Sequence, residues 1–574
     1  MREKNIKFFE ICNYLDILES ESSRLKIIKI LSELINITPV EDIPKLMYIL
    51  NGRVEPFYIK SDFNIGKKIL IKVLSNIFKK DSEFIQNEIH KYGDLGEVYF
   101  RNQNLSPSEK SFSDIFLILK NIANTSGDKS MEIKENLLNQ TLSSLSGQEG
   151  KYFIRIILSN FRLGFGYKTI LSALSISPSN DKSSLKYIEE AYYKCSDLGA
   201  VAKMAISDIH SIRDLSVKVG IPIFPKLVDR AENFEEPIKR FGEVYVQPKF
   251  DGIRCQIHID ENSNVKLFSR NLNDITEMFP DFVSKFKNMN INGAIFDSEI
   301  LGLDLSTNKF LAFQDTVKMK RKNNIIATDN TKIKAFIFDL IYLNKKSFLN
   351  ESLSNRLLVL RNFFDNNSID LSGIEITDTI KMNNKDKIYN YFEKCINEGL
   401  EGIVIKNPKS VYSPGTRNSD WLKLKKDSLV GVVDTIDAVI MGYYSGEGIR
   451  SKFGIGGVLL GIYDDKSMKF KTICKLGSGF SQKVLVELKK DLDLHLMNNP
   501  DKSYLYNKNI IPDYWVEPYL VVTVKFDEIS KSPVHTSNFA LRFPRFISFR
   551  NDKGVYDSTK IDEVKKMYEI NKKI

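Results

Sequence analysis

The sequence predicts three regions of different structural class: an all-α domain over residues 1–212, an α/β domain over residues 213–428 and a small β-barrel over residues 429–574. Three observations support this division. Up to about residue 212, apolar residues recur at spacings of three and four, which is typical of amphipathic helices. Short strand-like runs then alternate with helical patterns up to about residue 428. Beyond Leu429, glycine clusters separate strand-like runs, as in small barrels.

Six segments of the first region carry the helical spacing, and polar connectors that contain glycine separate them. No fixed-period repeat is evident, so the pattern predicts a helical bundle and not a solenoid. The connector Arg162–Lys168 places glycine beside cations. Backbone amides in such loops can hold phosphates, and ordinary helix capping is the alternative. The predicted helices are Phe8–Leu18, Leu25–Ile35, Ile69–Ile77, Ile115–Ile122, Tyr152–Leu163 and Ile188–Ala200.

The boundaries between regions follow from local composition. Gly220–Lys226 contains two prolines and no helical period, so we expect it to link the first region to the second.

Five runs of the third region are strand-like, with glycine clusters such as Gly454–Gly457 between them. The predicted strands are Asp437–Tyr443, Gly457–Tyr463, Lys469–Lys475, Trp515–Phe526 and Phe546–Phe549.

Composition narrows the functional class. The 574 residues suffice for three or four domains, and 42% hydrophobic with 27% charged residues is ordinary for a soluble globular protein. No long apolar run occurs and Met1–Lys4 opens no secretory segment, so we expect a soluble intracellular protein with no membrane partner. The five cysteines form no CxxC pair, which argues against zinc ribbons and disulfides. The net charge of +10 favours a polyanion such as nucleic acid, with a Lys- and Asn-rich bias as the alternative.

The stretch Val246–Arg254 holds the chemistry on which the rest depends. Alternating residues predict one strand before it and another over Arg254–Ile259. Lys249 and Asp251 are two residues apart, so an extended backbone points both to the same side, and Gly252 allows a turn or the close approach of a ligand. A lysine beside a carboxylate at a strand edge suits a lysine nucleophile, and it equally suits an ordinary ion pair.

Further stretches of the middle region add cations, carboxylates and aromatic rings. Arg270 ends a strand, where it suits a phosphate or a ribose. Ile295–Ile300 places an isolated carboxylate at a strand end, and the aromatic residues of Ala335–Tyr342 could stack on a base. Strand-end charges are usually solvated, and a Phe in a buried strand usually belongs to the core.

Three charged residues of the later strands are harder to explain as ordinary surface groups. Glu401 begins an apolar strand, and Lys423 and Lys425 share one face of another. Two like charges on one face favour an anion between or above them. Together the stretches suggest a lysine nucleophile, cations that hold phosphates, and two carboxylates for a divalent metal.

These motifs, in this order and spacing, resemble those of the ATP-dependent DNA ligases, a family of covalent lysine nucleotidyltransferases. The resemblance covers essentially the whole chain. Ile122–Gly127 and Arg162–Gly164 look like the DNA-binding domain of the archaeal and eukaryotic replicative type, and the last motif implies an OB-fold for the barrel. The motifs are Lys249–Arg254, Ser269–Asn271, Asp297–Ile300, Phe338–Asn344, Glu401–Lys406, Trp421–Lys425, Leu541–Phe546 and Arg550–Lys553.

The resemblance implies ATP as substrate and Mg²⁺ or another divalent cation such as Mn²⁺. Lys249 would attack the α-phosphate and hold AMP as a phosphoramidate, with Asp251 beside it in the catalytic group. Lys423, Lys425 and the metal would lower the pKa of Lys249 and offset charge on the phosphate.

The resemblance also assigns the remaining ATP and metal contacts. Glu299 would bind the ribose or a metal, Glu401 a metal, and Phe338 would stack on adenine. The basic residues that would bind ribose or phosphates, including the pyrophosphate leaving group, are Arg254, Arg270, Arg417, Arg550 and Lys553.

One position departs from the family pattern. Many relatives have Glu two residues before the nucleophile, where it accepts a hydrogen bond from the adenine amino group, whereas this chain has Gln247. The Gln247 carbonyl can still accept that bond, but the contact loses its charge. Whether dATP, ADP or GTP can replace ATP stays open.

The implied macromolecular partner is nicked double-stranded DNA. AMP would pass to the 5′-phosphate, and the 3′-hydroxyl would displace it to seal the strand, in replication, repair or recombination. The helical domain would hold the duplex through phosphate contacts, and the OB domain would swing about a hinge near Lys426–Val430. Phe8-Phe9 leaves a sliding clamp open as a partner, with core packing as the alternative. We expect a monomer, in the cytoplasm of a prokaryote or the nucleus of a eukaryote.

Three other functions compete with this interpretation. One is another lysine nucleotidyltransferase, an mRNA guanylyltransferase or an RNA ligase; capping enzymes share the Lys249 motif but not the large helical region or Arg542–Phe546. An NAD-dependent ligase would bring a cysteine-ligated zinc module. A catalytically silent nick-binding protein would be expected to have lost Lys249, Glu401 or Lys425, and all three are present.

Overall fold

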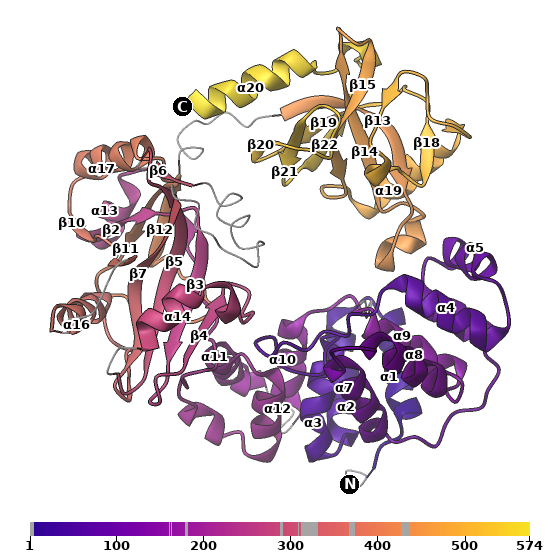
Figure 1. Cartoon of the computed structure of the whole chain (residues 1–574), viewed down its shortest axis with the longest axis horizontal. Helices are drawn as coiled ribbons and strands as arrows, with labels where there is room; N and C mark the ends of the chain where they lie inside the picture. Colours follow the sequence, from indigo (N-terminus) through magenta and orange to yellow (C-terminus); the bar gives the residue numbers. More distant parts are fainter. Residues whose placement is uncertain are drawn as a thin grey trace. The chain divides into compact units, whose positions relative to one another are not determined.

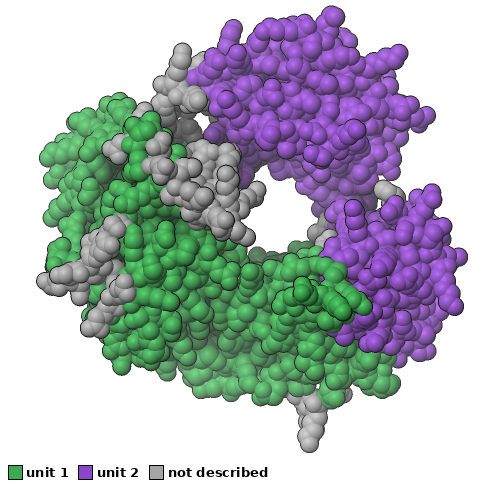
Figure 2. All heavy atoms as spheres, viewed as in Figure 1, with its two compact units in different colours: residues 1–64, 108–134, 156–431 green, residues 65–107, 135–155, 432–574 purple. Residues whose placement is uncertain are grey.

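A computed structural model describes residues 5–159, 161, 163–177, 182–287, 291–307, 309–311, 331–366, 373–425 and 435–573. The chain forms two compact units (Figure 2). One unit comprises Met1–Asn64, Ser108–Lys134 and Ile156–Gly431, and the other comprises Ile65–Pro107, Glu135–Arg155 and Val432–Ile574. The hinge expected near Lys426–Val430 lies outside the described residues. Within the described part of the chain, no helix has both the length and the apolar character needed to cross a membrane.

The N-terminal region is helical, as predicted, because each helix buries one apolar stripe. In α7 (Phe112–Asn124), Ser111 caps the helix and five residues that follow the helical spacing are buried. In α1 (Phe8–Ser20), Phe8 is completely buried, which supports its packing in the core. The other helices of this region are α1 (Phe8–Ser20), α2 (Arg24–Ile37), α3 (Ile43–Leu50), α4 (Lys67–Phe78), α5 (Ser82–Tyr92), α6 (Leu95–Asn102), α8 (Ser130–Leu142), α9 (Gly147–Ile157), α10 (Tyr167–Ile176), α11 (Leu185–Cys195) and α12 (Leu198–Ser207).

Two of the predicted helices were wrong in extent. The segment Tyr152–Leu163 leaves the helix at Ile157, because Ser159 adopts a left-handed backbone with φ 50°. The segment Ile188–Ala200 is two helices, since Ser196 is left-handed and the Asp197 carboxylate caps the next helix by accepting from the Ala200 amide. Apolar spacing passes through both breaks, so periodicity alone could not locate them.

The middle region contains two sheets, which carry most of the candidate site (Figure 1). The five-stranded sheet has the order β1 (Asp229–Arg230), β12 (Trp421–Lys425), β11 (Gly402–Lys406), β2 (Val244–Lys249), β10 (Ile380–Met382). The seven-stranded sheet has the order β4 (Val265–Ser269), β3 (Ile253–Ile259), β5 (Ala294–Asp304), β7 (Thr331–Leu343), β8 (Lys346–Ser347), with β6 (Lys309–Phe310) beside β5 and β9 (Ile374–Ile376) beside β7.

Helices cover the outer faces of both sheets. Figure 1 shows α13 (Glu236–Phe241) and α17 (Lys385–Asn397) beside the five-stranded sheet, and α14 (Pro280–Lys287) and α16 (Leu353–Asn366) beside the seven-stranded one. Along β2, β11 and β12 every second residue joins the apolar core beneath α17. The alternate residues of these strands therefore point to the opposite face, where the polar site residues lie.

The third region is a β-barrel of the predicted class, and one predicted strand is two. Glu517–Leu520 interrupts the run Trp515–Phe526, which forms β18 (Tyr514–Val516) and β19 (Val521–Lys525). Two amphipathic helices, α19 (Gln482–Asp493) and α20 (Ile561–Lys573), were not predicted. The remaining strands are β13 (Thr435–Tyr444), β14 (Gly457–Asp464), β15 (Lys469–Leu476), β16 (Leu496–Met497), β17 (Tyr504–Leu505), β20 (Glu528–Lys531), β21 (Phe539–Arg542) and β22 (Arg545–Phe549).

A completely buried ion pair joins β7 to α16 in the middle region. The Arg356 guanidinium donates to both carboxylate oxygens of Asp339, over 2.7 and 2.9 Å. Its remaining nitrogen donates to the backbone oxygens of Glu351 and Ser410. Both side chains are 0% exposed, so every donor must be satisfied by the protein.

We expect Asp339→Asn to destabilise the middle region by about 3–5 kcal/mol, because it leaves the buried Arg356 charge without its counterion. The measurement is the urea midpoint of Trp421 fluorescence in a Trp515→Phe background, where Trp421 is the one tryptophan left. Glu243→Gln is the matched control, because Glu243 pairs with Lys381 at the surface and should contribute only about 0–1 kcal/mol. Equal midpoints for the two variants would contradict the expectation.

Candidate active site

Strand register brings three distant motifs together in the five-stranded sheet. Strand β11 lies between β2 and β12, and Gly402 is directly opposite Lys249 on one side and Lys425 on the other. Two residues further, Val404 is opposite both Gln247 and Lys423. Because opposed residues in antiparallel strands point to the same face, all four polar side chains share one face of the sheet.

Glu401, immediately before β11, connects two of these lysines. One of its carboxylate oxygens pairs with the Lys249 ammonium and the other with the Lys425 ammonium. The side chains of the three residues are 21–31% exposed, so the cluster is accessible from one side. Its geometry depends on Gly402, whose φ is 149° and whose hypothetical Cβ would lie 2.1 Å from the Leu424 oxygen.

A second carboxylate, on the seven-stranded sheet, acts electrostatically on Lys249. Glu299 lies within β5 and not at a strand end as expected, because the strand continues to Asp304. Burial raises the pKa of Glu299 to about 7, against the opposing charges of Lys249 and Arg254, and the Gly252 amide hydrogen-bonds to the Glu299 carboxylate. A Cβ on Gly252 would lie 2.5 Å from the Ile300 oxygen, so a larger residue could not keep this close approach.

Burial lowers the pKa of Lys249, while the carboxylates of Glu299 and the exposed Asp251 act in the opposite direction. Arg270 and Arg254 also lower it. The pKa of Lys423 is lowered by burial and then by the positive charges of Lys249, Arg417, Arg270 and Arg230. The site thus gathers cations around two carboxylates, an arrangement suited to a phosphate chain.

Arg254 is held by a buried network that the sequence did not reveal. Its guanidinium donates to both oxygens of the completely buried Asp297, at 3.1 and 2.7 Å, and to the Lys226 carbonyl at 2.8 Å. The Tyr412 hydroxyl donates to the same carboxylate at 2.7 Å. Arg254 therefore uses most of its donors within the protein, which favours a role in supporting the site over direct nucleotide contact.

Phe338 forms part of an aromatic platform. Its ring packs edge-to-face on Trp421, with the centroids 6.3 Å apart. The Lys406 ammonium lies 4.7 Å from the Phe338 ring centroid and 3.9 Å from that of Trp421. Burial lowers the pKa of Lys406 to about 7.

The Gln247 side chain is 2% exposed, and both of its donors are used. Its amide nitrogen donates to the Phe338 carbonyl at 3.3 Å and to the Thr379 hydroxyl oxygen at 2.8 Å. Since a backbone carbonyl can only accept, the nitrogen must face Phe338. The side-chain oxygen is left as the acceptor for a ligand.

Two further predicted ATP contacts belong to the barrel. Arg550 and Lys553 follow β22, and both donate to one oxygen of Asp437, at 2.8 and 2.7 Å. Arg550 also forms a two-point pair with Asp552. Asp437 had no recognisable sequence signal, because it lies in the ordinary strand β13.

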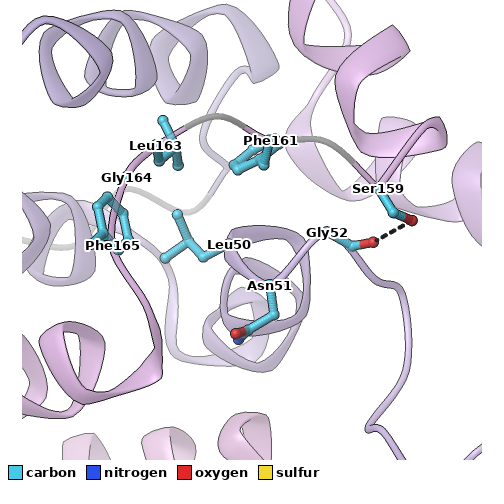
Figure 3. Close-up of a pocket in the computed structure, with 8 residues that line it drawn as sticks. All are labelled: Leu50, Asn51, Gly52, Ser159, Phe161, Leu163, Gly164 and Phe165. Carbon is cyan, nitrogen blue, oxygen red and sulfur yellow. Dashed lines mark hydrogen bonds between the residues drawn. The ribbon is translucent and has the colours of Figure 1, made fainter. Parts of the chain in front are cut away.

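The glycine connectors of the helical region form a depression of about 460 Å³ (Figure 3). Asn51 and Gly52 follow α3, and Ser159, Phe161 and Leu163–Phe165 lie between α9 and α10. The Ser159 hydroxyl donates to the Gly52 carbonyl at 3.4 Å. Arg162, a residue of the predicted motif, lies outside the described residues.

The structure thus groups Gln247, Lys249, Glu299, Glu401, Lys423 and Lys425, with Arg270 and Arg417 near Lys423. It does not place three or more His, Cys, Asp or Glu side chains in a metal-ligand cluster among the described residues. Thr379 and Tyr412 were missed, and Asp297 was noted only as part of the motif Asp297–Ile300, because no local pattern predicts the long-range partner of any of the three.

Comparisons with known proteins cover all three regions. Residues 7–175 match a family described as the DNA ligase N terminus, residues 225–425 the ATP dependent DNA ligase domain, and residues 451–553 the ATP dependent DNA ligase C terminal region. A probable DNA ligase of Dictyoglomus turgidum is 38% identical over 99% of this chain and 98% of its own length. A DNA ligase of Saccharolobus solfataricus is 33% identical over 98% of this chain and 97% of its own.

A solved structure titled Pmar-Lig_PreS3 covers 94% of this chain and 99% of its own, with a TM-score of 0.58 and 18% identity, which shows a shared fold. The confirmed fold class is therefore a helical region, a nucleotidyltransferase domain and a C-terminal OB-like barrel. The capping-enzyme, RNA-ligase and silent-binder alternatives are set aside by the full-length relatives. The chain belongs to the ATP-dependent DNA ligases, the family of enzymes that seal nicks in duplex DNA.

Proposed function

We propose that Lys249 is the nucleophile of this ligase and carries AMP between ATP and nicked DNA. The neutral Nζ attacks the α-phosphorus of ATP, a P–N bond forms, and the bond to the bridging oxygen breaks as pyrophosphate leaves. A 5′-phosphate oxygen of the nick then displaces Lys249 from the same phosphorus. Finally the 3′-hydroxyl attacks the activated 5′-phosphorus, loses its proton and releases AMP.

The observation that carries this proposal is the environment of the Lys249 amine. A lysine of ordinary pKa is protonated at neutral pH and cannot attack, whereas burial and nearby cations lower the pKa here. Arg270, one of these cations, and the neighbouring Lys423 would bind the triphosphate and offset the charge that develops as pyrophosphate leaves.

Glu299 and Glu401 fit a divalent cation. Both carboxylates face Lys249, and Mg²⁺ in nucleotide sites uses one or two carboxylates together with phosphate oxygens and water. A bound Mg²⁺ or Mn²⁺ supplies positive charge beside the phosphates. Lys249 and Lys425 both pair with Glu401, so the lysines also keep the carboxylate in place.

The nucleotide would lie between the polar residues of the five-stranded sheet and those of the seven-stranded sheet. Phe338 offers a ring face, the Gln247 oxygen an acceptor for the adenine amino group, and Arg270 and Arg417 exposed cations for phosphate. Arg254 acts through Asp297 to hold the β3 end in position. On the barrel, Asp437 holds Arg550 and Lys553 side by side for the pyrophosphate group.

The duplex would contact the helical region at the depression between the two glycine connectors. Exposed Lys168 lies in the first turn of α10, three residues after Phe165, which lines the depression. One chain carries all of the proposed residues, so we propose that it acts as a monomer. It would work in the compartment that holds the DNA, a prokaryotic cytoplasm or a eukaryotic nucleus.

Burial of Phe8 gives no support to a sliding-clamp contact at Phe8-Phe9.

We expect wild-type protein incubated with α-³²P-ATP and Mg²⁺ to carry label on a denaturing gel, and Lys249→Ala to carry none. Lys266→Ala, an exposed lysine on β4, should label normally and is the control. Adding nicked DNA should discharge the label and yield sealed strand. A labelled Lys249→Ala variant would refute the assignment of the nucleophile.

The pKa of Lys249 can be measured without nucleotide or metal, by its acylation rate as a function of pH with peptide mass spectrometry. The midpoint should lie below 10.5, because burial favours the neutral amine. Glu401→Gln removes a paired carboxylate that favours the protonated form, so the midpoint should fall further. A midpoint that rises in this variant would contradict the proposed ion pair.

We expect Lys168→Ala to weaken binding of nicked duplexes of any sequence, because a phosphate contact carries no base information. The slope of log affinity against log salt should fall in magnitude by about one. Lys168→Arg keeps the charge and is the matched control. Equal salt slopes for wild type and Lys168→Ala, in fluorescence anisotropy titrations, would remove Lys168 from the DNA contacts.

A further inference from the structure

A glutamine at position 247 raises a question of purine choice. A carboxylate could only accept a hydrogen bond, but an amide presents an acceptor on one side and donors on the other. Rotated by half a turn, the same side chain would donate to the 6-oxygen of a guanine-type base. Selectivity for adenine therefore requires that the orientation of this amide be held by the protein.

The contacts around Gln247 hold one orientation. The Phe338 carbonyl and the Thr379 hydroxyl oxygen both accept from the amide nitrogen. The Thr379 hydroxyl cannot easily reverse its role, because its proton is donated to the Thr377 carbonyl at 3.2 Å. Turning the amide over would place its oxygen against the Phe338 carbonyl and forfeit both bonds.

The position of Thr379 follows from the topology. Strand β9 pairs with β7 of the seven-stranded sheet, and β10 pairs with β2 of the five-stranded sheet. Residues 377–379 join these two strands, so the chain crosses from one sheet to the other beside Gln247. The Thr377 amide donates to the Ile337 carbonyl at 2.8 Å, which anchors the start of this crossing.

We infer that Thr379 is a positioning residue for purine selection: with the Phe338 carbonyl, it holds the Gln247 oxygen toward a 6-amino group and against a 6-oxo group. The inference rests on the proposed function, because it requires the nucleotide to bind beside Lys249. It assigns to Thr379 no contact with the nucleotide and no part in the chemistry.

The test compares self-adenylation of the full chain with α-³²P-labelled ATP and ITP. Hypoxanthine carries a 6-oxygen and lacks the 2-amino group of guanine, so it reports on the 6-position. Thr379→Val removes the acceptor at nearly constant shape. Loss of one buried hydrogen bond should reduce the ATP-to-ITP ratio of efficiencies about 3- to 10-fold, with ITP use rising. Thr379→Ser, which keeps the hydroxyl, should restore the wild-type ratio.

Thr377→Val is the matched control. The Thr377 hydroxyl is buried and has no hydrogen-bond partner among the described residues, so its replacement should leave the ratio unchanged. An unchanged ratio in Thr379→Val, or equal losses with both nucleotides, would overturn the inference. A wild-type protein that takes no label from ATP would instead refute the proposed function, so the two failures are distinguishable.

Discussion

The register of β11 between β2 and β12 is the constraint on which the candidate site depends. By placing Gly402 opposite both Lys249 and Lys425, it puts the Glu401 carboxylate between two ammonium groups that are far apart in the sequence. A shift of one residue would turn these side chains to the other face, into the core beneath α17. The apolar residues that alternate with the site residues therefore maintain the site, because their burial specifies the register.

Charge is distributed unequally around Lys249, and this distribution suits a nucleophile. Two buried arginines are each matched by a carboxylate, Arg356 by Asp339 and Arg254 by Asp297. The cations near Lys249 are partly exposed and outnumber their carboxylates, with Lys423, Arg270 and Arg417 contributing positive potential. These buried pairs fix the seven-stranded sheet and the helix α16 that packs on it, whereas partly exposed, incompletely matched charge is available for a polyanionic ligand.

Much of the fold could be predicted from local pattern. Helical spacing, alternation and glycine clusters were enough for the fold class, because burial of one face imposes a period on the sequence. Errors fell where apolar spacing continues across a break, as at Ser196 in the α11–α12 connection and between β18 and β19. Short capping and turn residues decide such breaks, and their effect depends on a few backbone hydrogen bonds that periodicity does not record.

The sequence by itself determined the family and the side chains available for chemistry, because Lys249, Glu299, Glu401, Lys423 and Lys425 belong to short motifs whose order is visible along the chain. The tertiary structure decided their partners. Asp297 for Arg254, Asp437 for Arg550 and Lys553, and Thr379 for Gln247 are separated by 43 to 132 residues and share no motif. Strand register and sheet crossings create these contacts, and a hydrogen bond depends on position in space and not on distance along the chain.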